Sequence, residues 1–287
     1  MNLTPLRISR RPIAVATAFV GMVSLAIGAH AALNKRAPEP AGAVATEQAA
    51  DAPRSASKLA LVIGNGHYPD ANAPLTQPIN DGRALTAALR RDGFDVDVVE
   101  DASRDDMSRA IGRLKSKVGP DSVVMLFFGG YGVQSGRESY MIPVDATIWR
   151  EPDVRRHGIS IESVLGMVKE QGARALLAVI DASRRNPYER RFRAFSHGLA
   201  PIGAPDNTLV LTSATPGKVA DDTAHQHSVL MTELLQNLNA QGSSGAEAVF
   251  NTTRLAVSRA SDGAQVPSVS SSLSEDIRLG AVANAGS

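Results

Sequence analysis

An alternation of short apolar runs with amphipathic stretches, sustained over most of the chain, constrains the fold more than any other feature. The runs KLALVIG (Lys58–Gly64), SVVMLFFGG (122–130) and ARALLAVID (173–181) are apolar almost throughout, which is typical of strands buried on both faces. The stretch 79–93 between the first two has apolar residues at helical intervals. Strands alternating with helices predict a parallel sheet covered by helices on both faces. Further strands are predicted at 94–100, 207–214 and, as an edge segment, 265–273, and further helices at 103–119 with Ser103 as N-cap, 159–172, 228–241 and 245–261.

The N-terminal segment is predicted to lie outside this fold. Three arginines within residues 7–11 precede an apolar run to about Ala29 and the small-residue sequence AHA at 29–31, which together indicate an export signal. The run is also just long enough for an uncleaved membrane anchor, which stays as the alternative. We therefore expect an export signal at 1–31, a flexible Ala/Pro-rich linker at 32–57, one domain at 58–280 and a tail at 281–287, and an exported protein, periplasmic or anchored to the inner membrane facing the periplasm.

Charge and cysteine content exclude several classes of function. Residues 1–31 contain three arginines and no acid, so the rest of the chain carries 27 basic and 29 acidic side chains, a net charge of −2. This balance gives no basic footprint for a nucleic acid, and none is expected as a partner. The chain has no cysteine, which excludes disulfides, thiolate zinc sites and thiol nucleophiles.

Two loops at predicted strand ends have unusual sequences. GGYG (Gly129–Gly132) follows the apolar run 122–130, and DASRRNP (181–187) follows the run 173–181. Ligands of parallel sheets bind beyond the carboxyl ends of the strands, so these loops form the candidate site.

Seven blocks of sequence, in order, resemble caspase-like peptidases, and most closely the bacterial relatives of metacaspases. The resemblance covers residues 58–280, and its blocks are LALVIGNGHY, PLTQPINDGRALTAAL, GFDVDVVEDA, FFGGYGVQSGRESYMIPVDA, LLAVIDASRRNP, LTSATPGKVADD and HSVLMTELL. It implies a three-layer α/β/α sandwich around a mostly parallel sheet of about six strands. Activity is a separate question from fold.

The resemblance also implies where a catalytic dyad would lie. In active relatives the first loop carries a Gly-His-Gly element and the second an Asp-x-Cys element. Here Tyr131 stands at the histidine position and Ser183 at the cysteine position, while the flanking Gly130, Gly132 and Asp181 fit the pattern.

Neither substituted side chain suits catalysis. A cysteine has a pKa of about 8.5 and is partly ionised near neutrality, whereas a serine hydroxyl needs a base. A tyrosine with a pKa of about 10 is protonated at pH 7 and donates rather than accepts. We therefore expect Tyr131 and Ser183 to form an inert pair, with a hydrogen bond between their hydroxyls. The remaining alternative is a base from another loop, for which the candidates are His67, His157, His197, His225 and His227, the last two being the best placed.

No cofactor and no metal site are expected. The alternative is a metal pair in the sequence HQH at 225–227, with Asp221 and Asp222 just before it.

A binding pocket is implied even where the chemistry is absent. The resemblance places Asp81 and Asp181 where relatives hold a basic side chain of the substrate, with Gly130 and Gly132 beside them, and two converging carboxylates suit a guanidinium. The alternative is that Asp81 favours its helix dipole and Asp181 caps its loop. The arginines at 184, 185, 190, 191 and 193 form either a loop that reaches this pocket or a solvated basic loop.

These observations predict an exported, caspase-like pseudoprotease. It would bind a peptide or protein segment, with a basic segment as one option, without cutting it, and could pair with itself or with an active relative as a regulatory or scaffold module. One alternative is a residual peptidase that cuts after Arg or Lys with Ser183 as nucleophile. The other is a structural envelope domain that has abandoned the cleft, which Tyr131 and the arginine loop would then fill.

Overall fold

The computed structural model describes residues 57–71, 74–191, 198–220, 225–240 and 244–280. The chain divides into two units, Met1–Ala52 and Pro53–Ser287, and all described residues belong to the second. The predicted export segment, the linker except Ser57, and the tail at 281–287 lie outside the described residues. Within the described ranges, no helix has both the length and the apolar character needed to cross a bilayer.

A six-stranded sheet forms the centre of the domain. Its order is β2 (Asp95–Glu100), β1 (Lys58–Gly64), β3 (Val123–Gly129), β7 (Ala175–Asp181), β8 (Thr208–Thr212) and β9 (Ser268–Ser271). Neighbouring strands are parallel except β8 and β9, which are antiparallel. The mostly parallel α/β architecture implied by the resemblance is confirmed, as is the edge strand near residue 270.

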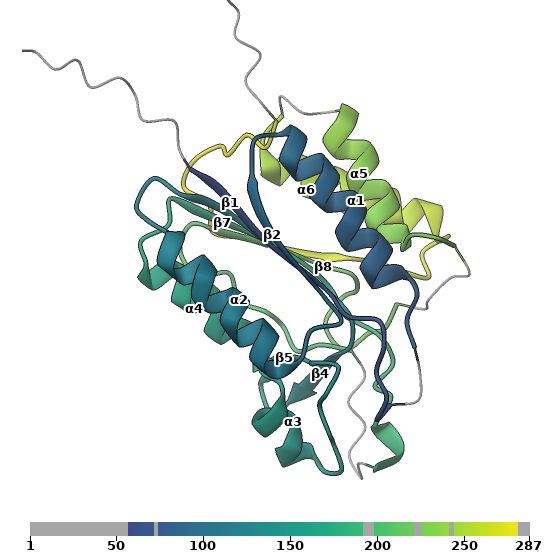
Figure 1. The fold of residues 1–287 in the computed structure, drawn as a ribbon. Helices are drawn as coiled ribbons and strands as arrows, with labels where there is room; N and C mark the ends of the chain where they lie inside the picture. Colours follow the sequence, from purple (N-terminus) through teal and green to yellow (C-terminus); the bar gives the residue numbers. More distant parts are fainter. Residues whose placement is uncertain (1–56, 72–73, 192–197, 221–224, 241–243, 281–287) are drawn as a thin grey trace, which may run out of the picture. The chain divides into compact units, whose positions relative to one another are not determined.

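Helices cover both faces of this sheet (Figure 1). Helices α1 (Gln77–Arg91), α5 (Val229–Ala240) and α6 (Ala246–Ala260) pack on one face, and α2 (Arg104–Lys117) and α4 (Ile161–Glu170) pack on the other. Alternate residues of one strand serve the two cores: Met125 and Phe127 of β3 belong to the first, and Leu126 and Phe128 to the second. Because both faces are buried, the central strands must be apolar at every position, which is the pattern seen in the sequence.

Local signals explain where two of the helices begin and end. Ser103 caps α2 as predicted: its Oγ accepts a hydrogen bond from the Asp106 N–H at 3.2 Å, and the Asp106 carboxylate accepts one from the Ser103 N–H. Gly93 follows α1 with φ of +84°, a conformation that glycine adopts without steric cost. Helix α1 itself begins at Gln77, two residues before its predicted start.

The sequence did not predict a second, small sheet. Strands β4 (Gly132–Ser135), β5 (Glu138–Met141) and β6 (Ile159–Ser160) form it, and α3 (Glu151–His157) lies between β5 and β6 in the chain. Figure 1 shows β4, β5 and α3 beyond one end of the main sheet. Strands of two to four residues are too short for a period of two to be recognised.

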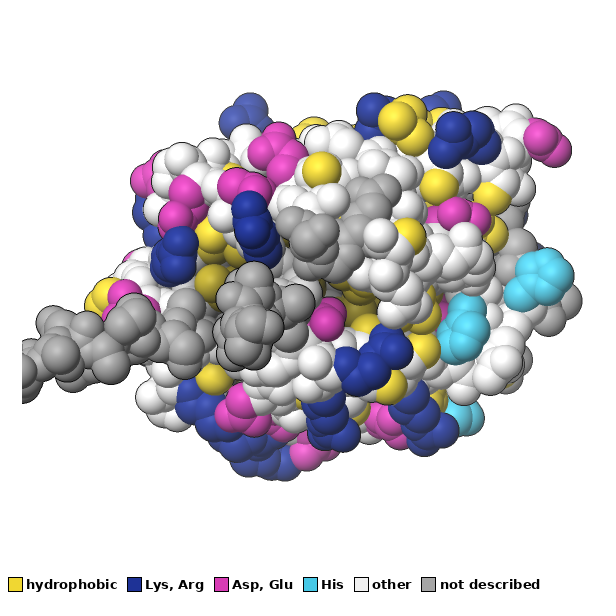
Figure 2. Space-filling model, turned by 90° about the horizontal axis from the view of Figure 1, so that it is seen from above, with side chains coloured by type: hydrophobic (Ala, Val, Ile, Leu, Met, Phe, Trp, Pro, Cys, Tyr) yellow, Lys and Arg dark blue, Asp and Glu magenta, His cyan; other side chains and the backbone are white. Residues whose placement is uncertain are grey.

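Charged side chains of both signs are interspersed on the surface. On the face drawn in Figure 2, Lys and Arg side chains alternate with Asp and Glu, and histidines gather at one side. Edge strand β2 follows the same pattern, because its Asp95 and Asp97 pair with Lys117 and Arg113 at 2.6 and 2.8 Å. Charges on an exposed strand discourage pairing with another chain.

Candidate functional site

The two unusual loops lie side by side at the carboxyl ends of neighbouring strands. Gly129, the last residue of β3, is the register partner of Asp181, the last residue of β7. Two further backbone hydrogen bonds continue this ladder beyond the strands: the Gly130 N–H donates to the Asp181 carbonyl at 3.3 Å, and the Gly132 N–H donates to the Ala182 carbonyl at 3.0 Å. The structure therefore brings the loops at 130–132 and 181–183 together.

Gly130 and Gly132 are positions at which a side chain does not fit. A Cβ at Gly132 would lie 2.6 Å from the Leu199 side chain and 2.9 Å from the Ala182 carbonyl oxygen, and one at Gly130 would overlap the Tyr68 hydroxyl. The glycines thus allow the loop to pack closely against its surroundings.

Tyr131 belongs to a cluster of aromatic side chains. Its ring packs edge-on against Tyr68, with 4.8 Å between the ring centroids, and its side chain is almost fully buried. The Tyr131 N–H donates to the Tyr68 hydroxyl at 3.0 Å, and that hydroxyl donates to the Ile142 carbonyl at 3.2 Å. Tyr68 therefore contacts both the ring and the backbone of Tyr131.

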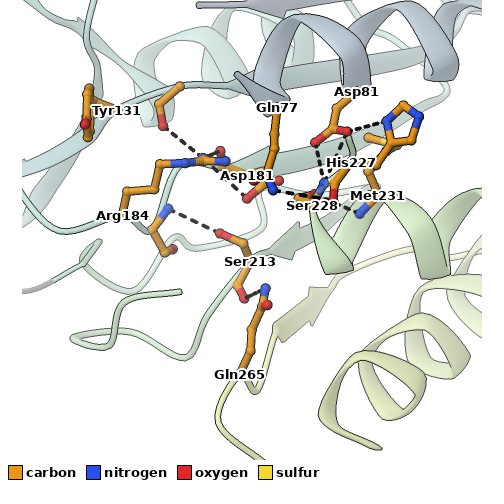
Figure 3. Close-up of polar contacts among 12 residues, drawn as sticks. Gln77, Asp81, Tyr131, Asp181, Arg184, Ser213, His227, Ser228, Met231 and Gln265 are labelled. Atoms are coloured by element: carbon orange, nitrogen blue, oxygen red, sulfur yellow. Dashed lines mark hydrogen bonds and ion pairs between the residues drawn. The ribbon is translucent and has the colours of Figure 1, made fainter. Parts of the chain in front are cut away.

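Ser183 is buried, and its hydroxyl is an isolated polar group. It is 1% exposed, and its Oγ has no hydrogen-bond partner in the part of the chain that the structure describes. Its backbone is fixed, since the Ser183 N–H donates to Ser213 Oγ at 3.2 Å and its carbonyl accepts from the Ala220 N–H at 2.7 Å. Figure 3 shows Ser213 held in turn by Gln265, whose amide donates to the Ser213 carbonyl at 2.8 Å.

The predicted hydrogen bond between the Tyr131 and Ser183 hydroxyls is therefore wrong. The physical reason is that packing against Tyr68 decides the orientation of the Tyr131 ring, while the contacts with Ser213 and Ala220 decide the position of the Ser183 backbone.

No described histidine acts on Ser183 as a base. His227 Nδ1 lies 2.8 Å from an Asp81 carboxylate oxygen, and the exposed His67 Nδ1 lies 2.5 Å from Asp101. His225 is exposed, and its carbonyl accepts from the Gln77 side chain. His197 lies outside the described residues. An imidazole would have to be within hydrogen-bond reach to take the serine proton, and the isolated Ser183 Oγ has none there among the residues described.

Asp81 is a fully buried acid that joins α1 to the start of α5. It accepts hydrogen bonds from His227 and from the Ser228 N–H, the latter at 3.2–3.3 Å. Burial raises the pKa of Asp81 to about 6, with the nearby charge of Asp181 adding to the effect and the bonds to His227 and Ser228 opposing it. The helix-dipole explanation of Asp81 is wrong, because α1 begins at Gln77 and has no acid in its first turn.

Asp181 is also buried, and it faces an arginine of its own loop. Arg184, 4% exposed, places its Nη1 3.5 Å from Asp181 Oδ1 and donates to the backbone carbonyls of Asp181 and, at 3.1 Å, Gly130. In Figure 3 the Arg184 side chain points towards Asp181, and His227 points towards Asp81. Asp181 Oδ2 is buried without a hydrogen-bond partner in the described chain, so one acceptor of the pair is still unsatisfied.

The arginine loop is neither wholly solvated nor wholly turned to the acids. Arg184 is the member that reaches Asp181, whereas Arg185 is exposed and pairs with Glu189 at 2.6 Å, and Arg191 pairs with Asp70 at 2.7 Å. Arg193 lies outside the described residues.

An open cleft lies beside Tyr131. Its volume is about 630 Å³, and it runs along the segment that follows Ser183. The side chains that line it come from Ala71, Tyr131, Arg185, Asn186, Pro187, Glu189, Arg190 and Arg191.

The described residues contain no metal centre. No group of three or more His, Asp or Glu side chains is arranged to hold a metal ion within the described ranges. Asp221 and Asp222, the acids that precede His225 and His227, lie outside the described residues.

Several members of the site could not be recognised in the sequence. Gln77 donates to the carbonyls of His225 and His227, Ser228 donates to Asp81, and Ser213 supports Ser183. Partners such as Asp81 and Ser228, which are 147 positions apart, are joined only by the packing of α1 against α5, and no spacing rule reveals them.

Comparison with known families decides the relationship. A family model described as the caspase domain, peptidase family C14, matches residues 57–278. The chain belongs to the caspase-domain family. The human mucosa-associated lymphoid tissue lymphoma translocation protein 1 is 28% identical over 144 residues, which are 50% of this chain and 17% of that protein. Its mouse homologue is 27% identical over 138 residues, 48% of this chain and 16% of that protein. The matched region thus spans about a sixth of these relatives.

A solved structure supports the same fold. Caspase-1 from Spodoptera frugiperda superposes with a TM-score of 0.59 at 15% sequence identity, covering 80% of this chain and 92% of that one. At this identity the likeness concerns the caspase fold alone, and the chemistry has to be argued from the residues above.

Proposed function

We propose that this caspase-domain chain is a pseudoprotease, which binds peptide segments without cleaving them. The observation that carries the proposal is Ser183: a buried hydroxyl with no base within hydrogen-bond reach in the described chain, at the position where active relatives are expected to carry a cysteine. A serine in that state stays protonated and cannot attack a carbonyl. Tyr131, at the expected histidine position, is packed against Tyr68 and is a poor proton acceptor at neutral pH.

Two features support retained binding. The cleft of about 630 Å³ beside Tyr131 offers a peptide segment a place to bind next to the buried dyad positions. Asp181 Oδ2 is buried without a hydrogen-bond partner in the described ranges, and with Asp81 nearby it favours a ligand that brings a donor such as a guanidinium or an ammonium group. Arg184 already compensates one oxygen of Asp181, so the ligand would add to an existing ion pair.

Export and partnership remain part of the proposal. The N-terminal segment suggests a protein outside the cytoplasm, held by the membrane if the segment is not cleaved. A caspase domain that captures peptides without turnover could withhold them from an active relative, or pair with one and regulate it.

Turnover is tested by comparing three forms of the chain on fluorogenic peptides that end in Arg or Lys. We expect no turnover by the native chain or by Ser183→Ala, and measurable turnover by the double variant Tyr131→His/Ser183→Cys, in which a thiol and an imidazole are restored. Turnover by the native chain that disappears in Ser183→Ala would instead identify a residual serine peptidase.

Binding is tested with a labelled peptide containing one arginine and its twin in which citrulline replaces that arginine. Citrulline keeps the shape and removes the charge, so the arginine peptide should bind about tenfold more tightly. Asp181→Asn should remove this difference, while Asp262→Asn, in the turn after α6, should not. Asp262 has φ of +50°, which asparagine also accepts. Equal affinity for both peptides would contradict a role for Asp181.

A further inference from the structure

The cleft beside Tyr131 contains a buried hydrogen-bond donor that finds no acceptor among the described residues. Asn186 lines the cleft and is 3% exposed, and its Nδ2 has no hydrogen-bond partner among the residues described. Its Oδ1 accepts from the Tyr188 N–H at 2.9 Å, which fixes the orientation of the amide. The unsatisfied atom is therefore in the NH₂ group, which can only donate, and its burial without a partner is destabilising.

The charged side chains around that donor leave an excess of one cation. Three of the lining residues are arginines, and two of these are paired with acids, Arg185 with Glu189 and Arg191 with Asp70. Arg191 is held in place, because it pairs with Asp70 and its guanidinium lies 4.4 Å from the centroid of the Trp149 ring. Arg190 is exposed on the same wall and has no ion-pair partner within the described ranges. A carboxylate, with its two acceptor oxygens, is the peptide side chain that can accept from an amide NH₂ and a guanidinium together.

We propose that this cleft binds an acidic side chain of the captured peptide, with Asn186 and Arg190 as the residues that determine this specificity. This inference rests on the proposed function and names its ligand class. The unsatisfied donor of Asn186 and the unsatisfied acceptor of Asp181 are of opposite kind. A peptide that carries both a basic residue and an acidic residue complements both, whereas a purely basic peptide leaves Asn186 unpaired and faces the arginines of the cleft.

The test compares two labelled peptides on the full chain by fluorescence anisotropy. The first is Ala-Leu-Arg-Ala-Glu-Glu, and the second replaces both glutamates with glutamine, which keeps the size and removes the charge. We expect the glutamate peptide to bind about tenfold more tightly, with a preference that declines as salt is added.

The variants separate recognition of the carboxylate from stability. Asn186→Asp preserves the oxygen that Tyr188 needs and replaces the donor with an acceptor, so it should abolish the preference for glutamate. Arg190→Glu should do the same at the exposed wall, and Arg259→Glu on the exposed surface of α6 should leave it unchanged. Circular dichroism of each variant reports whether the fold is intact, and Arg190, being exposed, gives a reading that does not depend on the buried Asn186.

The outcomes distinguish this inference from the function on which it rests. Equal affinity for the two peptides would overturn the acidic preference while leaving peptide capture intact. An unchanged preference in both Asn186→Asp and Arg190→Glu would also overturn it. Failure of the native chain to bind either peptide at about 1 mM would overturn both proposals.

Discussion

Asp81 and Asp181 are buried carboxylates whose charges disfavour each other, and each is compensated by a different part of the chain. His227 and the start of α5 partner Asp81, and the neighbouring loop supplies Arg184 to Asp181. Their positions in the sequence marked both residues as site candidates through the resemblance. The partners could not be predicted, because they depend on contacts between distant elements.

The raised pKa of Asp81 gives a pH dependence of known sign. Its pKa is about 6 in the folded chain and about 3.8 in the unfolded chain, so the folded state binds more protons between these values. The stabilising contribution of this group is complete below pH 4 and is lost as the pH rises through 6. Asp81→Asn cannot ionise at this position, and its amide oxygen can still accept from Ser228. As the pH rises from 4 to 7, we therefore expect the unfolding free energy of the native chain to fall by up to roughly 3 kcal/mol more than that of Asp81→Asn.

Denaturant unfolding of the two proteins at pH 4, 5, 6 and 7 measures this difference. A gap between the native chain and Asp81→Asn that stays constant over the whole range would show that Asp81 has no raised pKa.

The ion pair of Arg184 and Asp181 predicts that losing the cation alone destabilises the fold more than losing both charges. Arg184→Met leaves Asp181 as a buried acid without its cation, and should cost about 3–5 kcal/mol of unfolding free energy. Adding Asp181→Asn removes the uncompensated charge and should restore part of that loss. Urea denaturation of the single and double variants tests it, and a double variant that is less stable than Arg184→Met would contradict the ion pair as the source of the cost.

At the scale of the elements, the hairpin of β4 and β5 continues the chain directly from the candidate site. Gly132 is its first residue, and the Gly132 N–H binds the Ala182 carbonyl next to Ser183. The long apolar strands and α2 with its Ser103 cap were predictable from local pattern, because burial on both faces and capping leave clear sequence signals. The hairpin was not, because its strands have four residues each.

Gly132→Ala should show how closely these loops are packed. The added methyl group would meet the Leu199 side chain and the Ala182 carbonyl, and the latter cannot move away without weakening its hydrogen bond. We expect a loss of about 1–3 kcal/mol, measured by thermal or denaturant unfolding. Gly112→Ala in α2, where the new methyl group has open space, should instead stabilise the helix by about 0.5–1 kcal/mol. Equal effects at both positions would argue against close packing at Gly132.

At the scale of the whole domain, one sheet separates two cores that share its strands. The alternation of strands and helices was enough to predict this arrangement, since only helices on both faces can bury strands that are apolar throughout. The sequence could not show which polar atoms would be left unsatisfied. The groups of Ser183, Asp181 and Asn186 that lack a partner within the described part of the chain are recognised only from the packing of distant elements.

The two cores should respond independently to small cavities. Val168 of α4 lies in one core and Val249 of α6 lies in the other. Replacing either valine with alanine removes two methyl groups and should lower the unfolding free energy by about 2 kcal/mol. Because the sheet lies between them, the double variant should lose the sum of the two within about 0.5 kcal/mol. Denaturant unfolding measures all three, and a double-variant loss that differs from the sum by more than about 1 kcal/mol would show that the cores are coupled.

The state of the Ser183 hydroxyl is tested most directly with a fluorophosphonate probe, which forms a covalent bond only with an activated serine. The full chain is incubated with the probe at neutral pH, and its intact mass is compared with that of Ser183→Ala treated in the same way. We expect no added mass on either protein. Addition of one probe to the native chain, located at Ser183 by peptide mapping and missing from Ser183→Ala, would contradict it.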